Sequence, residues 1–279
     1  MKTNSIASIT ANNLYAACFA LPVCCLYDIP LFFFIRDNIK NKTRVLYRLL
    51  CKKARTVITV SENMTARINA LPCPAGKIIL LENGFEFSRM QKYKKPKKNV
   101  KFLKTGITAQ LVPWKNHAFF LDVARKIINT GSNIKFYIIG GDYFHEHSLY
   151  KKKLQTEIKP YCNIIMTGFI GNIYPVINSL DIIILPSINE PFGRIIIEAM
   201  FFEKIIFAEK SCGASRVIRH NENGFLFSAA EGPDFVVKKI LELSENRDLR
   251  EKIGRQACAS VINRFAIKNH LPELGKIYA

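Results

Sequence analysis

The chain has 279 residues, of which 49% are hydrophobic and 23% are charged. This is a globular composition, long enough for about two domains of roughly 150 residues, and it excludes a mini-protein that depends on disulfides or a metal for stability. Lysine and arginine total 41 against 22 acidic residues, a formal net charge of +19, which attracts polyanions such as nucleic acid, anionic lipid or phosphorylated substrates, although a solvated basic surface has the same composition.

The most apolar part of the chain is residues 14–35, which contain Pro22, Asp28 and Pro30. The Asp-Ile-Pro sequence at its centre indicates a turn from a helix to a strand. A membrane-spanning helix needs an uninterrupted run of about 20 apolar residues. We therefore expect a buried helix followed by a buried strand at 31–35, and no transmembrane segment.

Further along the chain, short apolar runs alternate with helical segments such as 118–129 and 195–202. This alternation predicts an α/β fold with parallel sheets, whose ligands bind beyond the carboxyl ends of the strands. The predicted strands are 31–35, 57–60, 78–81, 102–107, 135–139, 164–167, 182–185 and 205–208.

Residues 91–101 read QKYKKPKKNVK and contain almost nothing apolar. This composition is typical of a linker, so we expect a domain boundary here. A patch that binds nucleic acid or lipid is the alternative interpretation.

The 8 cysteines form no C-x-x-C pair and have no histidines at zinc-ligand spacing, which predicts free thiols in a reducing cytosol. His145 and His147 flank Glu146. A metal or acceptor site is one interpretation of this cluster. A solvated loop explains it better, because no third ligand is evident.

The most informative stretch is residues 179–200, SLDIIILPSINEPFGRIIIEAM. A predicted strand leads into a loop that ends at Gly193, and a helix that contains Glu198 follows. Glycine lets the backbone approach a ligand closely, and the free N–H groups of a helix start suit a diphosphate. The carboxylates of Glu190 and Glu198 are suited to accept hydrogen bonds from sugar hydroxyls.

Glu190 and Glu198 form an E-x7-E motif that resembles the signature of retaining family-4 glycosyltransferases with the GT-B fold. The resemblance extends over nearly the whole chain and is most specific in its second half. Other segments that resemble the family in the same order are Val60-Ser61-Glu62, Glu82-Asn83-Gly84-Phe85, 109–116, 138–142, 167–169 and 223–226.

The resemblance implies catalytic roles for two residues: Lys115 places a cation on the donor diphosphate, and Glu190 contacts the donor sugar. Glu198 holds the ribose hydroxyls. The backbone N–H groups near Phe192 and Gly193 meet the phosphates.

Further donor-binding positions are implied by the neighbouring loops. Gly168 and Phe169 lie near the base, and Gln110 stands where the family has an arginine. Because an amide supplies no charge, Lys115 is expected to provide the positive charge for the donor diphosphate, with help from Arg194 or Arg216.

The first half departs from the family pattern. Phe34 replaces a donor-contacting histidine and takes no role from it. Arg36 is a candidate phosphate or acceptor contact, or a surface ion-pairing residue.

The resemblance implies two Rossmann-like domains with parallel sheets, the first of them incomplete. We expect a partial acceptor-side domain over 1–95, a nucleotide-sugar domain over 96–262, and a helix over 263–279 that returns to the first domain. A partner chain that supplies the missing half is one way to complete the first sheet.

The implied activity is retaining transfer of a hexose from a nucleotide diphosphate sugar to a glycan or lipid-linked acceptor in cell-surface polysaccharide synthesis. It resembles a front-face displacement that needs no cofactor, metal or protein nucleophile. The expected location is the cytoplasm, at the inner face of an anionic membrane. The alternative is an inactive or split-subunit fragment that only binds nucleotide-sugar. Nucleic-acid binding is not expected, since no recognition module is present.

Overall fold

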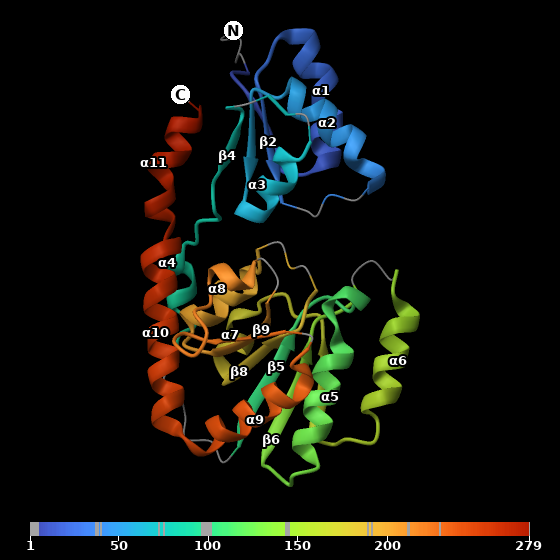
Figure 1. Ribbon diagram of the computed structural model, residues 1–279, viewed down its shortest axis with the longest axis vertical. Coiled ribbons are helices and arrows are strands. Elements are labelled where there is room, and N and C mark those ends of the chain that lie inside the picture. The colour runs from blue at the N-terminus through green and yellow to red at the C-terminus, as the bar shows by residue number, and fades with distance from the viewer. Residues whose placement is uncertain are drawn as a thin grey trace. The chain divides into compact units, whose positions relative to one another are not determined.

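The computed structural model describes residues 6–36, 39, 41–71, 73–74, 76–95, 102–142, 146–188, 190, 192–210, 213–228 and 230–278. The chain divides into two compact units (Figure 1). The N-terminal unit comprises Met1–Phe85 and Ile267–Ala279, and the C-terminal unit comprises Glu86–Ala266. The sequence analysis expected boundaries at 95/96 and 262/263, whereas the structure divides after Phe85 and after Ala266.

The sheet of the N-terminal unit has four parallel strands in the order β1-β2-β3-β4. Its strands are β1 (Ile9–Ala11), β2 (Leu31–Ile35), β3 (Thr56–Thr59) and β4 (Ile78–Leu80). Its helices are α1 (Leu14–Tyr27), α2 (Arg44–Lys53), α3 (Glu62–Asn69) and α11 (Ile267–Tyr278).

Every residue of β2 is buried, because helices cover both faces of this sheet. Phe33 packs in a cluster with residues of α1, α2 and α3, and its ring stacks on Tyr47 of α2 at 5.9 Å between centroids. Phe34 points to the opposite face, in a cluster with Ile277 of α11. A strand covered on both faces has no solvent side, which explains the continuous apolar sequence.

Helix α1 is where it was expected, but the expectation that it is buried was wrong. Asn13 caps it by accepting a hydrogen bond from the N–H of Ala16 at 2.8 Å. Ala17 faces the core, whereas Phe19 is 83% exposed and Leu26 is 75% exposed. The cause is that apolar residues surround the whole helix, while only one side packs on the sheet. Among the described residues, no helix combines the length and apolar character needed to cross a membrane.

The C-terminal unit contains a six-stranded parallel sheet in the order β10-β9-β8-β5-β6-β7. Its strands are β5 (Leu103–Thr108), β6 (Ile134–Ile139), β7 (Ile164–Gly168), β8 (Ile182–Leu185), β9 (Ile205–Glu209) and β10 (Phe225–Phe227). Its helices are α4 (Phe87–Gln91), α5 (His117–Ile128), α6 (Ser148–Ile158), α7 (Tyr174–Ser179), α8 (Arg194–Phe201), α9 (Gly232–Glu245) and α10 (Arg247–Phe265).

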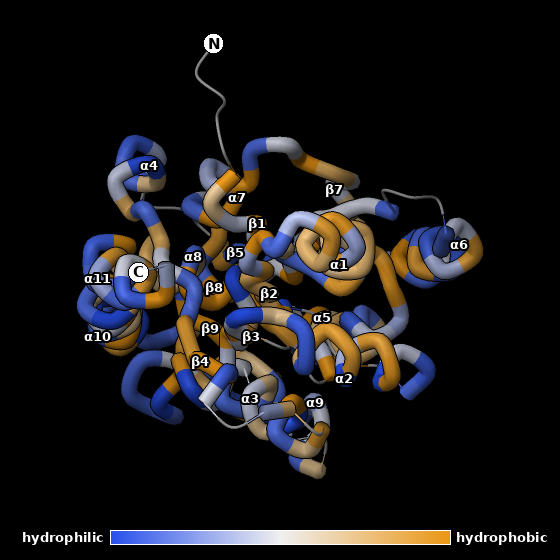
Figure 2. Tube along the Cα trace, turned by 90° about the horizontal axis from the view of Figure 1, so that it is seen from above, coloured by the Kyte–Doolittle hydropathy of each residue, from blue (hydrophilic) through white to orange (hydrophobic). Residues whose placement is uncertain are grey.

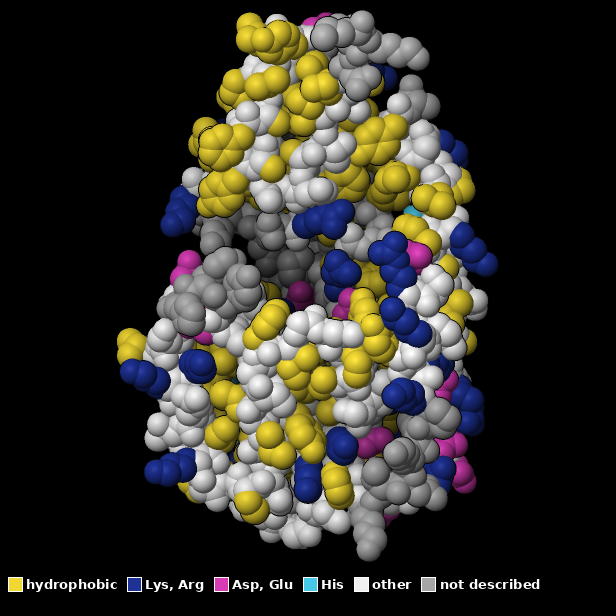
Figure 3. Space-filling model, turned by 180° about the vertical axis from the view of Figure 1, so that it is seen from behind, with side chains coloured by type: hydrophobic (Ala, Val, Ile, Leu, Met, Phe, Trp, Pro, Cys, Tyr) yellow, Lys and Arg dark blue, Asp and Glu magenta, His cyan; other side chains and the backbone are white. Residues whose placement is uncertain are grey.

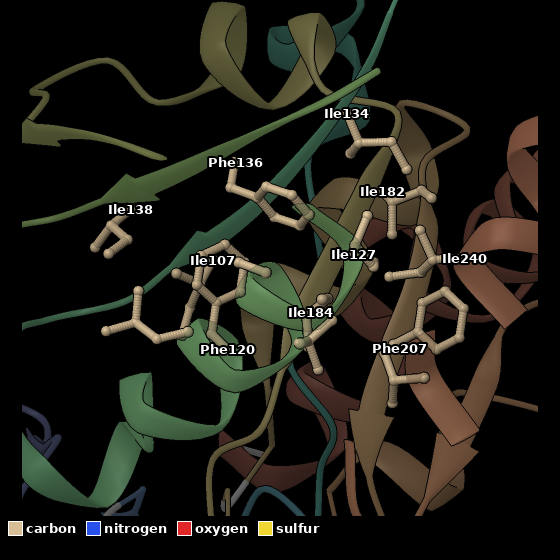
Figure 4. Packing of buried hydrophobic residues seen from close by; sticks show 14 of the residues in the cluster. Ile107, Phe120, Ile127, Ile134, Phe136, Ile138, Ile182, Ile184, Phe207 and Ile240 are labelled. Carbon is tan, nitrogen blue, oxygen red and sulfur yellow. The ribbon is translucent and has the colours of Figure 1, made fainter. Parts of the chain in front are cut away.

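The larger core lies between this sheet and helices α5 and α9. Phe120 of α5 and Ile240 of α9 pack against strand residues such as Phe136 and Phe207 (Figure 4). The rings of Phe120 and Phe136 meet edge to face at 6.0 Å. This core fixes the strands whose carboxyl ends carry the candidate site.

The predicted α/β class with two parallel sheets is confirmed. The strands at 31–35 and 182–185 have the predicted bounds, and the other six lie within one residue of prediction. Strands β1 and β10 were missed, because each has only three residues.

Two smaller sequence features lie partly outside the described residues. Of the expected linker, Gln91 ends α4, and positions 96–101 are not described. His145 is likewise not described, while the N–H of His147 donates to Asp142 Oδ2 at 3.1 Å. No group of three or more metal-ligating side chains occurs within the described ranges. The seven described cysteines are free thiols.

Candidate functional site

The candidate site lies where the strand order of the larger sheet reverses direction. Strands β5 and β8 are neighbours, but the chain continues from β5 to β6 on one side and from β8 to β9 on the other. In α/β proteins, ligands bind at such a switch point, beyond the carboxyl ends of the strands. The predicted motif residues lie in the loops that follow β5 and β8.

Lys115 ends a short turn, Pro113–Lys115, that follows β5. Asn116 comes next in the left-handed conformation, with a φ of 54°, and its side chain caps α5 by accepting from the N–H of Phe119 at 3.4 Å. The carbonyl of Trp114 accepts a hydrogen bond from the N–H of Ile188 at 3.1 Å. This bond joins the loop after β5 to the loop after β8.

The structure brings the two predicted catalytic residues into direct contact. Lys115 Nζ lies 2.5 Å from Glu190 Oε2, and the two side chains are 15% and 20% exposed. The ammonium group also lies 4.0 Å from the centroid of the Trp114 ring. A mostly buried cation held between a carboxylate and an aromatic face is well placed to meet an anionic ligand.

The loop after β8 leads into α8 through Gly193, whose left-handed backbone conformation favours glycine. Gly193 has a φ of 74° and caps α8 without any side-chain hydrogen bond to the helix. The carbonyl of Gly193 accepts from the N–H of Ile196 at 2.8 Å within the first turn. The start of a helix carries partial positive charge that suits an anion. Phe192 is buried and its ring meets Phe265 edge to face at 6.0 Å. This contact anchors the residue just before the helix start.

Gly213 holds the other side of the same loop. Its N–H donates to the carbonyl of Glu190 at 3.2 Å. A Cβ at this position would lie 2.6 Å from that carbonyl oxygen, so a larger residue would displace the loop. The Glu190 backbone is therefore fixed by Gly213, and its side chain is fixed by Lys115.

Glu198 lies one turn inside α8, and its side chain is 12% exposed. Burial raises the pKa of this carboxyl, and the nearby Arg194 guanidinium, 3.6 Å away, opposes the shift. Its negative charge also contributes to a raised pKa of Tyr174, although burial is the main cause there. A carboxylate in this setting gains from any hydroxyl that donates a hydrogen bond to it.

Gly168 ends β7 and Phe169 follows it, at the same edge of the sheet. The carbonyl of Gly168 accepts from the N–H of Gly140 at 3.0 Å, and Phe169 is exposed beside Gly141. A Cβ on Gly140 would lie 1.8 Å from the carbonyl oxygen of Ala109, so only glycine fits against the loop after β5. These glycines pack the three loops closely together.

The remaining predicted residues take different positions. Gln110 is exposed in the loop after β5, and Arg194 extends into solvent beside Glu198. Arg216 lies in the turn Ala214–Arg216, where its carbonyl accepts from Arg264 Nη1 at 2.6 Å. Within the N-terminal unit, the Arg36 guanidinium lies 5.3 Å from the ring of buried Phe34.

The sequence did not assign a role to His117, which is fully buried at the start of α5. Its Nδ1 lies 3.3 Å from the Tyr150 hydroxyl, and its Nε2 contacts no polar partner among the described residues. Burial, aided by the charge of Lys115, lowers the pKa of His117 to about 4. The imidazole is therefore neutral near pH 7 and adds no charge beside Lys115. In the sequence, only its position two residues after Lys115 could have indicated that His117 lies at the site.

The two parallel Rossmann-like sheets, with a lysine loop and a glycine-capped helix at the switch point, define the GT-B class of fold. The family model of glycosyl transferases group 1 matches residues 88–259, more than half of the chain, and the chain belongs to this family.

Individual relatives are distant. HepE of Anabaena, solved in complex with UDP and glucose, has a TM-score of 0.85 at 22% identity, over 97% of this chain and 77% of that one. The capsular polysaccharide biosynthesis glycosyltransferase CapM of Staphylococcus aureus is 25% identical over 81% of this chain and 61% of its own length. The poly(ribitol-phosphate) alpha-N-acetylglucosaminyltransferase of S. aureus is 25% identical over 68% of this chain and 38% of its own length. The chain thus spans less than two thirds of the curated relatives it matches.

Proposed function

We propose that this chain is a retaining glycosyltransferase that transfers a hexose from a nucleotide diphosphate sugar to a glycan or lipid-linked acceptor in cell-surface polysaccharide synthesis. The observation that carries the proposal is the contact between Lys115 and Glu190 in the loops that precede α5 and α8. Membership of the group 1 family and the names of CapM and the S. aureus poly(ribitol-phosphate) transferase support the reaction class. The UDP and glucose bound to HepE support the donor class.

In this proposal the donor diphosphate sits between Lys115 and the first N–H groups of α8. Both carry positive charge toward the phosphates, so both stabilise the charge that develops on the leaving nucleotide as the glycosidic bond breaks. Once the diphosphate contacts Lys115, the Glu190 carboxylate becomes available to accept hydrogen bonds from the sugar. Glu198 accepts those of the ribose hydroxyls, and Phe169 offers an exposed ring near the base.

Calorimetric titration with UDP-, GDP- and ADP-glucose tests the donor site. We expect one of the three to bind, and Glu198→Ala to weaken its binding about 10- to 100-fold, because a hydrogen bond to a charged group contributes about 1.5–3 kcal/mol. Glu242→Ala is the matched control, since Glu242 is an exposed residue of α9 that forms a surface ion pair with Lys239. If a folded chain binds none of the three sugars, the proposal is wrong.

The raised pKa of Glu198 adds a pH signature to the same titration. The ionised carboxylate is the better hydrogen-bond acceptor, so donor affinity should decrease as the pH falls through this raised pKa. The Glu198→Ala variant should lose that dependence. A wild-type profile that is flat on the acid side would contradict the role of Glu198.

We further propose that the reaction requires no bound metal and occurs in the cytoplasm at the inner face of an anionic membrane. Lys115 and the α8 start supply positive charge of the kind that a metal ion supplies to phosphates elsewhere. Addition of EDTA should therefore leave donor affinity and turnover unchanged. Loss of turnover that Mg²⁺ or Mn²⁺ restores would overturn the metal-independent form of the proposal.

A chain that binds nucleotide-sugar without transferring the sugar is the second candidate. Gln110 favours it, because this exposed neutral residue stands where the family resemblance implies an arginine. A partner chain that provides the acceptor site would make such a chain one subunit of a split enzyme. Donor binding without release of nucleotide diphosphate, with and without acceptor glycans, would support this candidate over the first.

A further inference from the structure

An apolar stripe runs along the outward side of α1. Tyr15, Phe19, Val23 and Leu26 are all exposed, and their spacing of four, four and three residues places them on one side of the helix. Figure 2 draws most of α1 in the hydrophobic colours. From Leu14 to Tyr27 the helix contains no charged residue. A helix that is apolar on all sides belongs in a buried or membrane-contacting position.

Helix α2 extends this stripe and adds cations to it. Val45 and Leu49 are exposed on its outward side. Both helices contribute buried residues to the same core on one face of the sheet, and they pack against each other. Their outward sides therefore form one continuous surface, which we name the α1–α2 face. Figure 3 shows hydrophobic side chains, in yellow, at the surface of the N-terminal unit.

Four exposed cations, Arg44, Arg48, Lys52 and Lys53, accompany the apolar residues on α2, and neither helix contains an acidic residue. Asp28 caps the end of α1, and in the sequence Asp37 precedes α2 and Glu62 follows it. A surface that combines exposed aromatic and aliphatic side chains with cations matches the interface of a bilayer that contains anionic lipid.

We propose that the α1–α2 face is the surface by which this protein lies on an anionic membrane. This inference rests on the peripheral membrane contact of the proposed function and names the residues that make it. The apolar stripe enters the boundary between headgroups and acyl chains, and the α2 cations contact the lipid phosphates.

Charge distinguishes this occupant from a second copy of the chain. Two α1–α2 faces in contact would bring together the four α2 cations of each copy without an acidic residue on either pair of helices. Such like-charge contact opposes association. A bilayer with anionic headgroups satisfies both the apolar stripe and the cations.

Cosedimentation with vesicles tests the proposal. The probes are vesicles of phosphatidylcholine mixed with phosphatidylglycerol, and vesicles of phosphatidylcholine alone. We expect binding to the mixed vesicles to exceed binding to phosphatidylcholine, and to weaken as salt is added. Phe19→Ser with Leu26→Ser should reduce the partition coefficient at least about tenfold, because two large apolar groups no longer enter the interface. Arg44→Gln with Arg48→Gln should reduce it about 25-fold, at roughly fivefold for each cation.

Matched controls come from α6 of the C-terminal unit. Leu149 is 83% exposed, as Phe19 is, and Lys151 and Lys152 are exposed cations. Leu149→Ser, and Lys151→Gln with Lys152→Gln, make the same kinds of change at a different place. They should leave vesicle binding within about twofold of wild type, because the contact is local rather than a property of net charge.

Three results would overturn the proposal. The first is equal loss of binding in the α1–α2 and α6 variants, which would indicate attraction by net charge alone. The second is wild-type protein that ignores the mixed vesicles. The third is a wild-type dimer that Phe19→Ser with Leu26→Ser converts to a monomer, which would assign the face to a second copy. Titration of the same variants with nucleotide-sugars separates this proposal from the transferase proposal, since donor binding involves other residues.

Discussion

The two units of this protein are both parallel sheets with helices on each face, but their helices leave different residues at the surface. In the C-terminal unit, α5 buries Phe120 and Ile127 and exposes Asp122 and Lys126. In the N-terminal unit, α1 buries Ala17 and exposes Phe19. Packing against the sheet and its neighbours covers the large apolar residues of α5. It covers only one side of α1.

This difference matches the separate roles that we propose for the two units. The loops that follow β5 and β8 hold Lys115 and Glu190 together, so the proposed donor site of the C-terminal unit lies at the ends of its strands. The exposed feature of the N-terminal unit is instead the outside of its helices. The two proposals thus assign donor binding to the C-terminal unit and membrane attachment to the N-terminal unit.

The largest effect is expected at Lys115. Replacing it in Lys115→Met removes the cation from the proposed diphosphate site and leaves the mostly buried Glu190 carboxylate without its partner. Turnover should fall about 10²- to 10³-fold, as when one electrostatic contact to a developing charge is removed. The measurement is the rate of nucleotide diphosphate release from the donor that binds.

Lys126→Met is the matched control, because Lys126 is an exposed cation that pairs with Asp234 on the surface of the same unit. It should leave turnover nearly unchanged. Equal rates for wild type and Lys115→Met would place the chemistry elsewhere and remove the basis for assigning it to the loops of the C-terminal unit.

The next largest effect concerns His117 and pH. Its pKa is lowered from 6.5 to about 4 in the folded protein, so the unfolded chain binds a proton more readily between these values. The stability that this neutral histidine contributes is complete above about pH 6.5 and is lost as the pH falls toward 4. A shift of this size corresponds to about 3 kcal/mol in the free energy of unfolding.

Urea unfolding of wild type and His117→Gln at several pH values measures this contribution. Glutamine retains a polar group for the Tyr150 hydroxyl but does not titrate, so the difference in stability between the two proteins should narrow as the pH falls. Parallel pH profiles for the two proteins would mean that His117 has an ordinary pKa and is accessible to water.

The sequence predicted the fold well where strands are long and buried on both sides. The run Leu31–Ile35 and the run Ile182–Leu185 have no polar residue, so their type and bounds were evident. The outer strands β1 and β10 were missed because three residues carry too little pattern. The exposure of Phe19 was missed for a different reason, since apolar composition does not reveal which side of a helix lacks a neighbour.

The candidate site was predictable because its residues follow strands in a motif with fixed spacing. The contact between Lys115 and Glu190 was not predictable from spacing alone, since the two residues are far apart in the chain and meet only because β5 and β8 are adjacent. His117 was missed because its contact with the Tyr150 side chain joins two residues that are far apart in the sequence.

A smaller effect is expected at Gly193, which holds the entry to α8. Gly193→Ala forces a Cβ into a left-handed backbone and places it 2.7 Å from Ile196 Cδ1. The strain should lower the free energy of unfolding by about 1–2 kcal/mol and weaken donor binding as the helix start shifts. Gly171→Ala is the control, because Gly171 has open space around it and no positive φ. Unchanged stability and donor affinity in Gly193→Ala would contradict a tightly fixed helix start.

The smallest expected effect tests the N-terminal side of the comparison. Phe19→Ala should change the free energy of unfolding by no more than about 0.5 kcal/mol, because an exposed ring has little contact to lose. Phe33→Ala, which empties a position in the core beneath α1, should cost about 3–5 kcal/mol. Urea unfolding in the absence of lipid measures both. If Phe19→Ala costs several kcal/mol, the outside of α1 is already covered by polypeptide in solution. In that case the apolar stripe is an interior surface of a larger assembly, and it is not open to a membrane.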